Sequence, residues 1–331
     1  MQQPRGIGRR RLGAAALAAL AVPRLARADA AWPTRPVRLI VGYPAGGSTD
    51  VCARILAEDF RTRLPQPVVV ENRTGVNGAL GAAHVAQSTD GHTLLVSNTS
   101  TMTVNHLMYR DARYHPLRDL TPIATITISP LIFVINPRNP RLAGVRSLAD
   151  LVALARRQPG RITYASAGVG NLQHLHMEQF LALAGAGMLH VPYRGSSLAT
   201  NAMVAGDVDV LLDNPTTGGP LIAAGTFAAL AVTGETRWRD LPDVPTVQES
   251  GYPDYVVLFW NALVAPASTP EPLVQRLHAM MRAAAENPAA RAPLLAQGDI
   301  LVLDPPSLRA RIVAEIERNA AIIKAAGIEM Q

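Results

Sequence analysis

Short apolar runs alternate along the chain with loops rich in glycine, proline and serine, and then with stretches of helical apolar spacing. The unit begins at Val37 and recurs several times. Such alternation is typical of α/β layers, in which helices cover a largely parallel sheet. The first units predict, in order, strand 37–41, helix 49–64, strand 68–71, a small-residue helix ending near 88, and strand 93–97.

A second series of units begins at the apolar stretch 131–135, which proline flanks on both sides. Its expected elements are helix 147–157, strand 162–166, helix 172–184, strand 189–191, helix 197–205, strand 208–212 and strand 228–232. After a turn-rich stretch, strand 260–264 is expected to return to the first series, followed by helices 270–286, 288–297 and 307–326. We therefore expect an α/β protein of two lobes, 31–129 plus 262–331 and 130–261, joined by crossing strands with a ligand cleft between them.

Two helical patterns predict which residues are buried. In the last helix, Leu308, Ile312 and Ile316 repeat at helical spacing, so this stripe should pack on the first lobe. Cys52 is the single cysteine, which excludes an intramolecular disulfide. Its spacing with Phe60 places it on an apolar helical face, which favours a buried structural role over a catalytic thiol.

The first thirty residues have the pattern of an export signal peptide. Arginines at 5 and 9–11 precede an apolar run, 12–22, which small residues follow. Cleavage after Ala28 or Ala30 fits the pattern, and we favour Ala30. The arginine run is compatible with either the twin-arginine or the general route. The apolar run is too short to span a membrane, and no later stretch reaches the necessary length.

The formal charge of +6 belongs largely to this leader, because residues 1–30 hold six arginines and one aspartate, or +5, and leave +1 for the rest. No basic cluster recurs afterwards, so we expect no nucleic-acid partner. Walker, Gly-x-Ser-x-Gly and His-Glu-x-x-His motifs are absent from the sequence. His174 and Glu178 share a helical face, which suggests a surface or interlobe pair. No third ligand has suitable spacing, so we expect neither a metal nor a cofactor.

One loop between a predicted strand and helix is a candidate anion site. Adjacent glycines allow close approach of a ligand, and the unpaired N–H groups of the helix start carry partial positive charge. The alternative is a tight turn with Ser48 or Thr49 as the N-cap and Asp50 in the first helical turn. The candidate ligand residues of this loop are Tyr43, Pro44, Ala45, Gly46, Gly47, Ser48, Thr49 and Asp50.

A second loop of the same design lies in the other predicted lobe. It also follows a strand and precedes a helix, so two helix N-termini facing each other across a cleft would clamp an anion. The alternative is that Asn171 only caps its helix and that Gly170 only permits the turn. The candidate ligand residues of this loop are Ser166, Ala167, Gly168, Asn171 and His174.

Ordered motifs over almost the whole chain after the leader resemble the Bug/TctC family, the extracytoplasmic receptors of tripartite tricarboxylate transporters. The resemblance implies a type II-like periplasmic binding fold that closes over its ligand like a flytrap, and it places Tyr193 and Asp213 as cleft walls. Their alternatives are core packing for Tyr193 and a turn cap for Asp213. The motifs include Trp32-Pro33-Thr34-Arg35-Pro36, the loop 42–50, Val69-Val70-Glu71-Asn72-Arg73, Asp90-Gly91-His92-Thr93, His190-Val191-Pro192-Tyr193-Arg194-Gly195 and Leu241-Pro242-Asp243-Val244-Pro245-Thr246.

We therefore expect a monomeric, non-catalytic periplasmic receptor. It would capture a small organic acid, such as a dicarboxylate, tricarboxylate, amino acid or aromatic acid, and deliver it to the permease subunits of a tripartite tricarboxylate transporter. One alternative is a receptor that signals to a membrane sensor. Another is a hydrolase on the same fold, with Ser166 or Ser48 as nucleophile and His174 as base.

Overall fold

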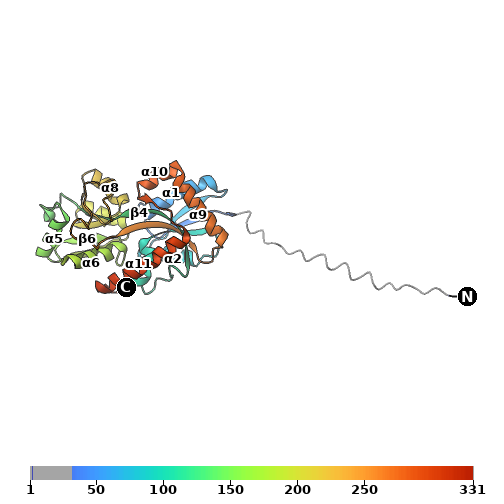
Figure 1. The fold of residues 1–331 in the computed structure, drawn as a ribbon, viewed down its shortest axis with the longest axis horizontal. Helices are drawn as coiled ribbons and strands as arrows, with labels where there is room; N and C mark the ends of the chain where they lie inside the picture. The colour runs from blue at the N-terminus through green and yellow to red at the C-terminus, as the bar shows by residue number, and fades with distance from the viewer. Residues whose placement is uncertain (1, 3–31, 331) are drawn as a thin grey trace.

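A computed structural model describes Gln2 and residues 32–330. The remainder of the predicted export signal lies outside the described residues. The described chain forms two α/β lobes side by side, each built around its own sheet (Figure 1). We call the part around the larger sheet the first lobe and the part around the smaller sheet the second lobe.

The first lobe contains a six-stranded sheet of order β11-β4-β10-β3-β1-β2. Strands β2, β1 and β3 are parallel, and β10 runs antiparallel to both β3 and β4. Strands β1 and β3 are mostly buried and rich in Leu, Ile and Val because helices cover both faces of this sheet. The strands are β1 (Val37–Val41), β2 (Val68–Asn72), β3 (Thr93–Asn98), β4 (Leu120–Pro130), β10 (Leu258–Pro266) and β11 (Asp299–Ile300).

The second lobe contains a five-stranded sheet of order β7-β6-β8-β5-β9. Strand β6 is parallel to β7 and β8, whereas β5 is antiparallel to β8 and β9. The chain enters this sheet at Leu131, between β4 and β5, and returns to the first sheet at the start of β10. The strands are β5 (Ile132–Ile135), β6 (Thr163–Ser166), β7 (Leu189–Pro192), β8 (Val210–Asp213) and β9 (Ala228–Val232).

Helices surround both sheets. Several begin at a side-chain cap that accepts a backbone N–H, such as Ser147 and Asn171. The α-helices are α1 (Ser48–Arg63), α2 (Ala79–Ala86), α3 (Thr99–Thr103), α4 (Asn105–Met108), α5 (Leu148–Arg157), α6 (Leu172–Ala184), α7 (Ser196–Ala205), α8 (Pro215–Ala223), α9 (Glu271–Glu286), α10 (Pro288–Leu295) and α11 (Pro305–Ala325). Two 3₁₀ turns, η1 (Val76–Gly78) and η2 (Pro140–Leu142), complete the set.

Some helices and strands were not predicted from the sequence pattern. Strand β4 alternates apolar residues with buried threonines such as Thr125 and Thr127, and this weakens its apolar signal. Helix α8 contains Gly218, Gly219 and Pro220, residues of low helix propensity. The short elements α3, α4 and β11 were also not predicted. Tertiary packing therefore overrides local preference in these segments.

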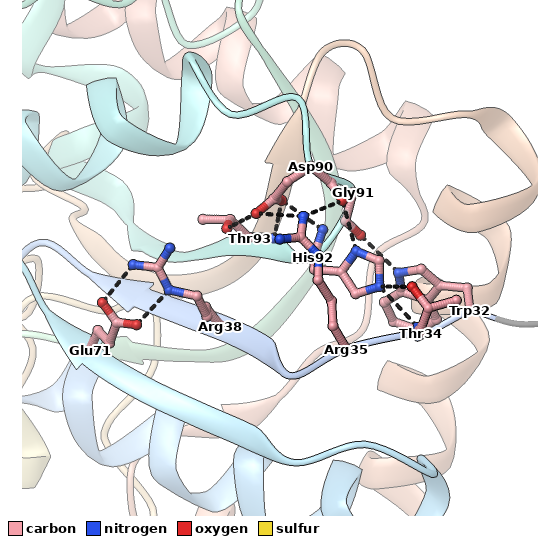
Figure 2. Close-up of polar contacts among 9 residues, drawn as sticks. All are labelled: Trp32, Thr34, Arg35, Arg38, Glu71, Asp90, Gly91, His92 and Thr93. Carbon is pink, nitrogen blue, oxygen red and sulfur yellow. Dashed lines mark hydrogen bonds and ion pairs between the residues drawn. The ribbon is translucent and has the colours of Figure 1, made fainter.

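The start of the described chain is fastened to the turn before β3 (Figure 2). Trp32 Nε1 donates to the carbonyl oxygen of Gly91 at 2.8 Å, and the Arg35 guanidinium pairs with Asp90 at 3.2 Å. His92 Nε2 accepts from Thr34 N at 3.1 Å, while Nδ1 lies 2.7 Å from the carbonyl oxygen of Asp90. Nε2 therefore accepts and Nδ1 donates, and these contacts make the segment before β1 part of the first lobe.

Helix α11, red in Figure 1, packs on both lobes. Its predicted stripe of Leu308, Ile312 and Ile316 packs in the first lobe, which confirms that expectation. Further along, Ile322 joins the apolar cluster that fills the second lobe, and Asn319 Nδ2 donates to Thr103 Oγ1 at 3.0 Å. The helix is thus a third connection between the lobes, besides the two chain crossings.

Cys52 is buried in the first lobe, as predicted. Its sulfur lies 3.6 Å from Asn261 Nδ2 and 3.6 Å from Thr127 Oγ1. Burial raises the pKa of the Cys52 thiol to about 12, so it remains protonated and unreactive. The cysteine therefore has a packing role.

Candidate ligand-binding site

Four helices of nine or more residues begin at one place between the lobes: α1, α6, α7 and α8. Each follows the carboxyl end of a strand, where ligands of open α/β sheets usually bind. Their first residues surround a cavity of about 30 Å³, which we call the inner cavity. It is lined by Tyr43, Gly47, Ser48, Thr49, Asn77, Asn98, Ser100, Ala167, Asn171, Leu172, Gln173, Ser196, Asn214 and Phe259.

A larger cavity of about 720 Å³, the outer cavity, opens beside it. The two share Tyr43, Asn77 and Ala167 in their walls. The outer cavity is bounded mainly by the loop after β1, the η1 turn, the loop after β6 and the loop after β7. It is lined by Gly42, Tyr43, Pro44, Thr74, Gly75, Val76, Asn77, Gly78, Ala167, Gly168, Val169, Pro192, Tyr193, Arg194, Gly195 and Leu198.

The electrostatic character of the inner cavity comes from dipoles. Within the described part of the chain, no Asp, Glu, Lys or Arg side chain lines it. Helix N-termini carry a partial positive charge and unpaired N–H groups, and α1 and α7 begin at glycines without a side-chain cap. The cavity therefore offers an anion a positive potential and polar groups without an opposing side-chain charge.

The backbone of the first ligand loop is held by close glycine packing. A Cβ at Gly42 would lie 2.6 Å from the Cα of Gly78, so only glycine allows this approach. The neighbouring Tyr43 hydroxyl lies 2.8 Å from the carbonyl oxygen of Asn77 and 3.1 Å from Asn98 Oδ1. Burial raises the pKa of Tyr43, so its hydroxyl stays neutral and donates. The loop and the η1 turn thus form one rigid wall.

Asp50 supports the first loop from behind. Its carboxylate accepts from Gly46 N at 3.0 Å, from Asn72 Nδ2 at 2.8 Å and from Arg54 in a two-pronged ion pair at 2.9 Å. Burial alone would raise the pKa of Asp50, but hydrogen bonds from Arg54, Gly46 and Asn72 outweigh it and lower the pKa. An ionised carboxylate therefore fixes the entrance to α1.

The second ligand loop is fixed mainly by amides. Asn171 caps α6 by accepting from His174 N at 2.8 Å. Gln173 accepts from Ala167 N at 2.8 Å and donates to the carbonyl oxygen of Leu212 at 2.7 Å, which joins the loop to β8. Leu172 N donates to Ser100 Oγ at 3.0 Å, a hydrogen bond between the lobes.

Two stacked histidines lie behind this loop. The rings of His174 and His190 are 4.1 Å apart, and Tyr164 stacks on His190 at 4.8 Å. His174 Nδ1 accepts from Gly170 N at 3.1 Å. Burial lowers the pKa of His174 to about 4, and burial with the charge of His174 lowers that of His190 to about 3. Both imidazoles are therefore neutral at pH 7.

The hydrolase alternative needs a serine paired with His174, and neither predicted pair is formed. Ser166 Oγ lies 2.7 Å from His190 Nε2 instead, and Ser166 is fully buried. Ser48 Oγ accepts from Asn261 Nδ2 at 3.0 Å. His174 and Glu178 also do not pair, because His174 is buried behind the loop and Glu178 accepts from the Tyr164 hydroxyl.

The structure divides the predicted ligand residues into two groups. Nine line a cavity: Tyr43, Pro44, Gly47, Ser48, Thr49, Ala167, Gly168, Asn171 and Tyr193. Six do not: Ala45 and Gly46 are exposed at the loop tip, and Asp50, Ser166, His174 and Asp213 are buried behind the walls.

Asp213 belongs to the supporting group. Its carboxylate accepts from Thr200 Oγ1 at 3.0 Å and from Asn214 N at 2.8 Å. Burial raises the pKa of Asp213 to about 6. This carboxyl group therefore fixes the start of α8, which is the turn-capping alternative that the sequence also allowed.

Several cavity residues were not predicted as ligand contacts, and two of them follow one rule. Asn98 ends β3 and caps α3, and Asn214 follows β8 directly and precedes α8. Carboxyl ends of parallel strands meet at one edge of a sheet, so an Asn that ends or directly follows such a strand is a usable signal. The other unpredicted residues of the inner cavity are Asn77, Ser100, Leu172, Gln173, Ser196 and Phe259.

The lobes touch around the cavities. A Cβ at Gly195 would lie 3.0 Å from Pro44 Cδ, and one at Gly47 would lie 3.6 Å from Ser196 Oγ. The Tyr109 hydroxyl also donates to the carbonyl oxygen of Val169 in the other lobe. The structure is therefore a closed arrangement.

Two further kinds of site have no counterpart among the described residues. No group of three or more His, Cys, Asp or Glu side chains there is arranged to hold a metal ion. Likewise, none of the helices among residues 32–330 is long and apolar enough to cross a membrane.

Comparisons with a family model and with known proteins place this chain in the same family. Residues 52–328 match the family model of the tripartite tricarboxylate transporter family receptor, TctC. Protein BugT of Bordetella pertussis is 34% identical over 303 residues, which are 91% of this chain and 92% of BugT.

Solved structures agree with this assignment. Rpa4515 of R. palustris with adipate has a TM-score of 0.85 and 32% identity, covering 90% of this chain and 99% of that one. The periplasmic binding protein BugD has a TM-score of 0.83 and 31% identity, with coverage of 91% and 100%. MatC of Rhodopseudomonas palustris with bound malate has a TM-score of 0.81 and 29% identity, with coverage of 88% and 100%. The chain therefore belongs to the Bug/TctC family of periplasmic solute receptors, as its sequence motifs predicted.

Proposed function

We propose that this chain is a non-catalytic receptor that binds a small carboxylate-bearing molecule between its lobes and delivers it to a membrane transporter of the tripartite tricarboxylate type. The observation that carries the proposal is the inner cavity, where four helix N-termini meet and no charged side chain of the described chain lines the wall. A carboxylate fits this environment because N–H groups and helix dipoles favour negative charge.

Two relatives support the ligand class. Rpa4515 is described with adipate and MatC with malate, and both are carboxylates. In this chain the two loops that carry the expected ligand residues line the same pair of cavities. Closure of lobes 31–129 plus 262–331 and 130–261 over the ligand requires that the closed state bind it more tightly than the open state.

A thermal-shift screen of the protein from residue 31 onward tests the ligand class. A carboxylate present at 100 times its Kd should stabilise the protein by about 2.7 kcal/mol, and the corresponding primary amide should not. Incubation of the same ligand with the protein, followed by analysis of the products, tests for turnover. A stabilising amide of equal potency would contradict carboxylate recognition, and turnover would contradict a pure receptor.

Gly47→Leu tests the site itself. A side chain at Gly47 points toward Ser196 in the other lobe, so leucine should prevent closure and abolish the shift. Ala45→Leu is the matched control, because Ala45 lies in the same loop but is exposed and lines neither cavity. An unchanged affinity of Gly47→Leu would remove the first loop from the site.

Export by residues 1–30 is a further part of the proposal. The precursor should yield a periplasmic protein that begins at Ala31, as N-terminal sequencing of that fraction would show. Changing Arg9 and Arg10 to lysine should retain the precursor in the cytoplasm if the twin-arginine route is used, and leave export intact for the general route. A full-length protein in the cytoplasm of the unmodified strain would contradict export.

Delivery to a transporter is tested in cells. Uptake of the identified ligand should depend on the receptor and on the permease subunits. Uptake that is unchanged without the receptor, combined with a ligand-dependent change in gene expression that needs it, would instead favour the sensing role.

A further inference from the structure

We propose that Arg194 forms a second anion subsite on the wall of the outer cavity, so that the receptor fits an elongated dianion. One carboxylate would lie at the helix N-termini of the inner cavity and a second anionic group at the Arg194 guanidinium. This inference rests on the proposed function and narrows its ligand class to dicarboxylates with an extended spacer.

The sizes of the two cavities support a ligand that spans both. The inner cavity, at about 30 Å³, has room only for a small group such as one carboxylate. The rest of any organic acid must lie in the outer cavity of about 720 Å³. Because Tyr43, Asn77 and Ala167 line both, one molecule is able to extend from the first into the second.

One residue in the wall of the outer cavity differs from the others because its side chain is charged. Among the described residues, Arg194 is the single charged side chain that lines the outer cavity. It has no hydrogen bond or ion pair with any other described residue, whereas Arg54 and Arg38 of the first lobe pair with Asp50 and Glu71. An unpaired guanidinium presents a planar set of donors that matches a carboxylate in a bidentate arrangement.

The wall of the outer cavity also contains apolar side chains. Pro44 and Val76 contribute them from the first lobe, and Val169 and Leu198 from the second. Such a wall favours methylene or aromatic carbon over hydroxylated carbon, because burial of apolar area is favourable and an unpaired hydroxyl is costly. The expected ligand therefore carries its polar groups at its two ends.

Isothermal titration of the wild type and Arg194→Gln tests the proposal. The panel is a series of straight-chain dicarboxylates of about four to eight carbons, each with the monocarboxylate of equal length. For the best dicarboxylate the variant should bind about tenfold or more weakly, since one charge-assisted bidentate contact is lost. For the monocarboxylates the two proteins should agree within about twofold, and Arg194→Lys should restore part of the dicarboxylate affinity.

Arg157→Gln is the control variant. It removes the same charge from the second lobe, but Arg157 is exposed on α5 and lines neither cavity. It should bind every ligand as the wild type does. An equal loss for dicarboxylates and monocarboxylates in Arg194→Gln, an unchanged dicarboxylate affinity, or an equal loss in Arg157→Gln would each overturn the second subsite. If no carboxylate binds the wild type, the proposed function itself fails, and this outcome is distinct from the others.

Discussion

The two ligand loops both join a strand to a helix, but side chains of different kinds hold them in place. In the first lobe, the ionised carboxylate of Asp50 gathers Gly46, Arg54 and Asn72 behind the loop. In the second lobe, neutral imidazoles of His174 and His190 stack behind the loop, and amide side chains fix it. Similar loops that present similar N–H groups can therefore be held by charge or by neutral packing.

This difference predicts which loop is sensitive to which change. A carboxylate that hydrogen bonds keep ionised loses its contribution to stability only in strong acid. A buried neutral histidine lowers the free energy of unfolding as soon as the same residue in the unfolded state gains a proton. Backbone packing differs as well, because Gly42 lies against another backbone and Gly168 faces comparatively open space.

The largest effect is expected from Gly42→Ala. Its Cβ would lie 2.6 Å from the Cα of Gly78, so two backbones must separate, at a cost of about 3 kcal/mol in the free energy of unfolding. The second-loop counterpart, Gly168→Ala, meets only the carbonyl oxygen of Tyr193 at 3.6 Å, although its φ of +151° disfavours alanine. Chemical denaturation should show a larger decrease in the free energy of unfolding for Gly42→Ala than for Gly168→Ala. The reverse order would contradict the difference in backbone packing between the two loops.

Asp50→Asn should have the next largest effect. The amide keeps the shape but loses the charge that Arg54 and the loop N–H of Gly46 require, for an expected loss of about 2 kcal/mol of stability. Ligand affinity should fall too, because the entrance to α1 loosens. Denaturation and calorimetry measure the two effects, and Asp111→Asn, at an exposed carboxylate outside both cavities, is the control. A stable variant of normal affinity would show that charge does not hold the loop.

Acid should weaken the second loop first. The folded pKa of His174, about 4, lies below the unfolded value of about 6.5, so the unfolded state binds more protons below pH 6.5. Stability is then complete above pH 6.5 and falls toward pH 4, by about 1 kcal/mol or more for His174 alone. Asp50, with its lowered pKa, loses its contribution only as pH falls below the unfolded value of 3.8.

Denaturation at pH 7, 6, 5 and 4.5 measures this slope. Burial also lowers the pKa values of His106 and His176 to about 4 and that of His190 to about 3. All three contribute to the slope, so His174→Gln should reduce it without removing it. His278→Gln is the control, because the half-buried His278 lies on α9, far from the second loop in the fold. A slope unchanged by His174→Gln would show that this histidine is not held neutral.

The smallest effect is expected from Ser100→Ala. It removes the hydrogen bond that Ser100 Oγ accepts from Leu172 N across the lobes, which is worth about 1 kcal/mol. If this contact belongs to the closed state, ligand affinity should fall about fivefold while the Tm without ligand changes little. An equal loss of Tm without ligand would show instead that the contact persists in the open state.

The sequence predicted elements where local pattern and packing agree. Strand β1, helix α6 and strand β9 have the predicted bounds because largely apolar runs or a helical period coincide with clear caps and turns. Strand β4 and helix α8 were missed because buried threonine in one, and glycine with proline in the other, conceal burial that only the tertiary structure provides.

Residues of both predicted loops line the cavities, but the orientation of their side chains was not predictable from the sequence. Asp50 and Ser48 are near neighbours in one loop and helix start, yet Ser48 lines the inner cavity and Asp50 points into the supporting network. Asn214 comes from a different strand end and reaches the cavity only because β8 lies beside β6. Side-chain direction and strand order decide these roles. Both are properties of the assembled sheet and not of the local sequence.

The third connection made by α11 constrains how the two halves of the molecule can move. Two chain crossings alone would permit both swinging and twisting, whereas a helix anchored at Ile312 on one half and Ile322 on the other opposes twisting. Restricting the relative orientations of the lobes reduces the entropy lost on capture, so we expect the C-terminal helix to raise affinity without touching the ligand.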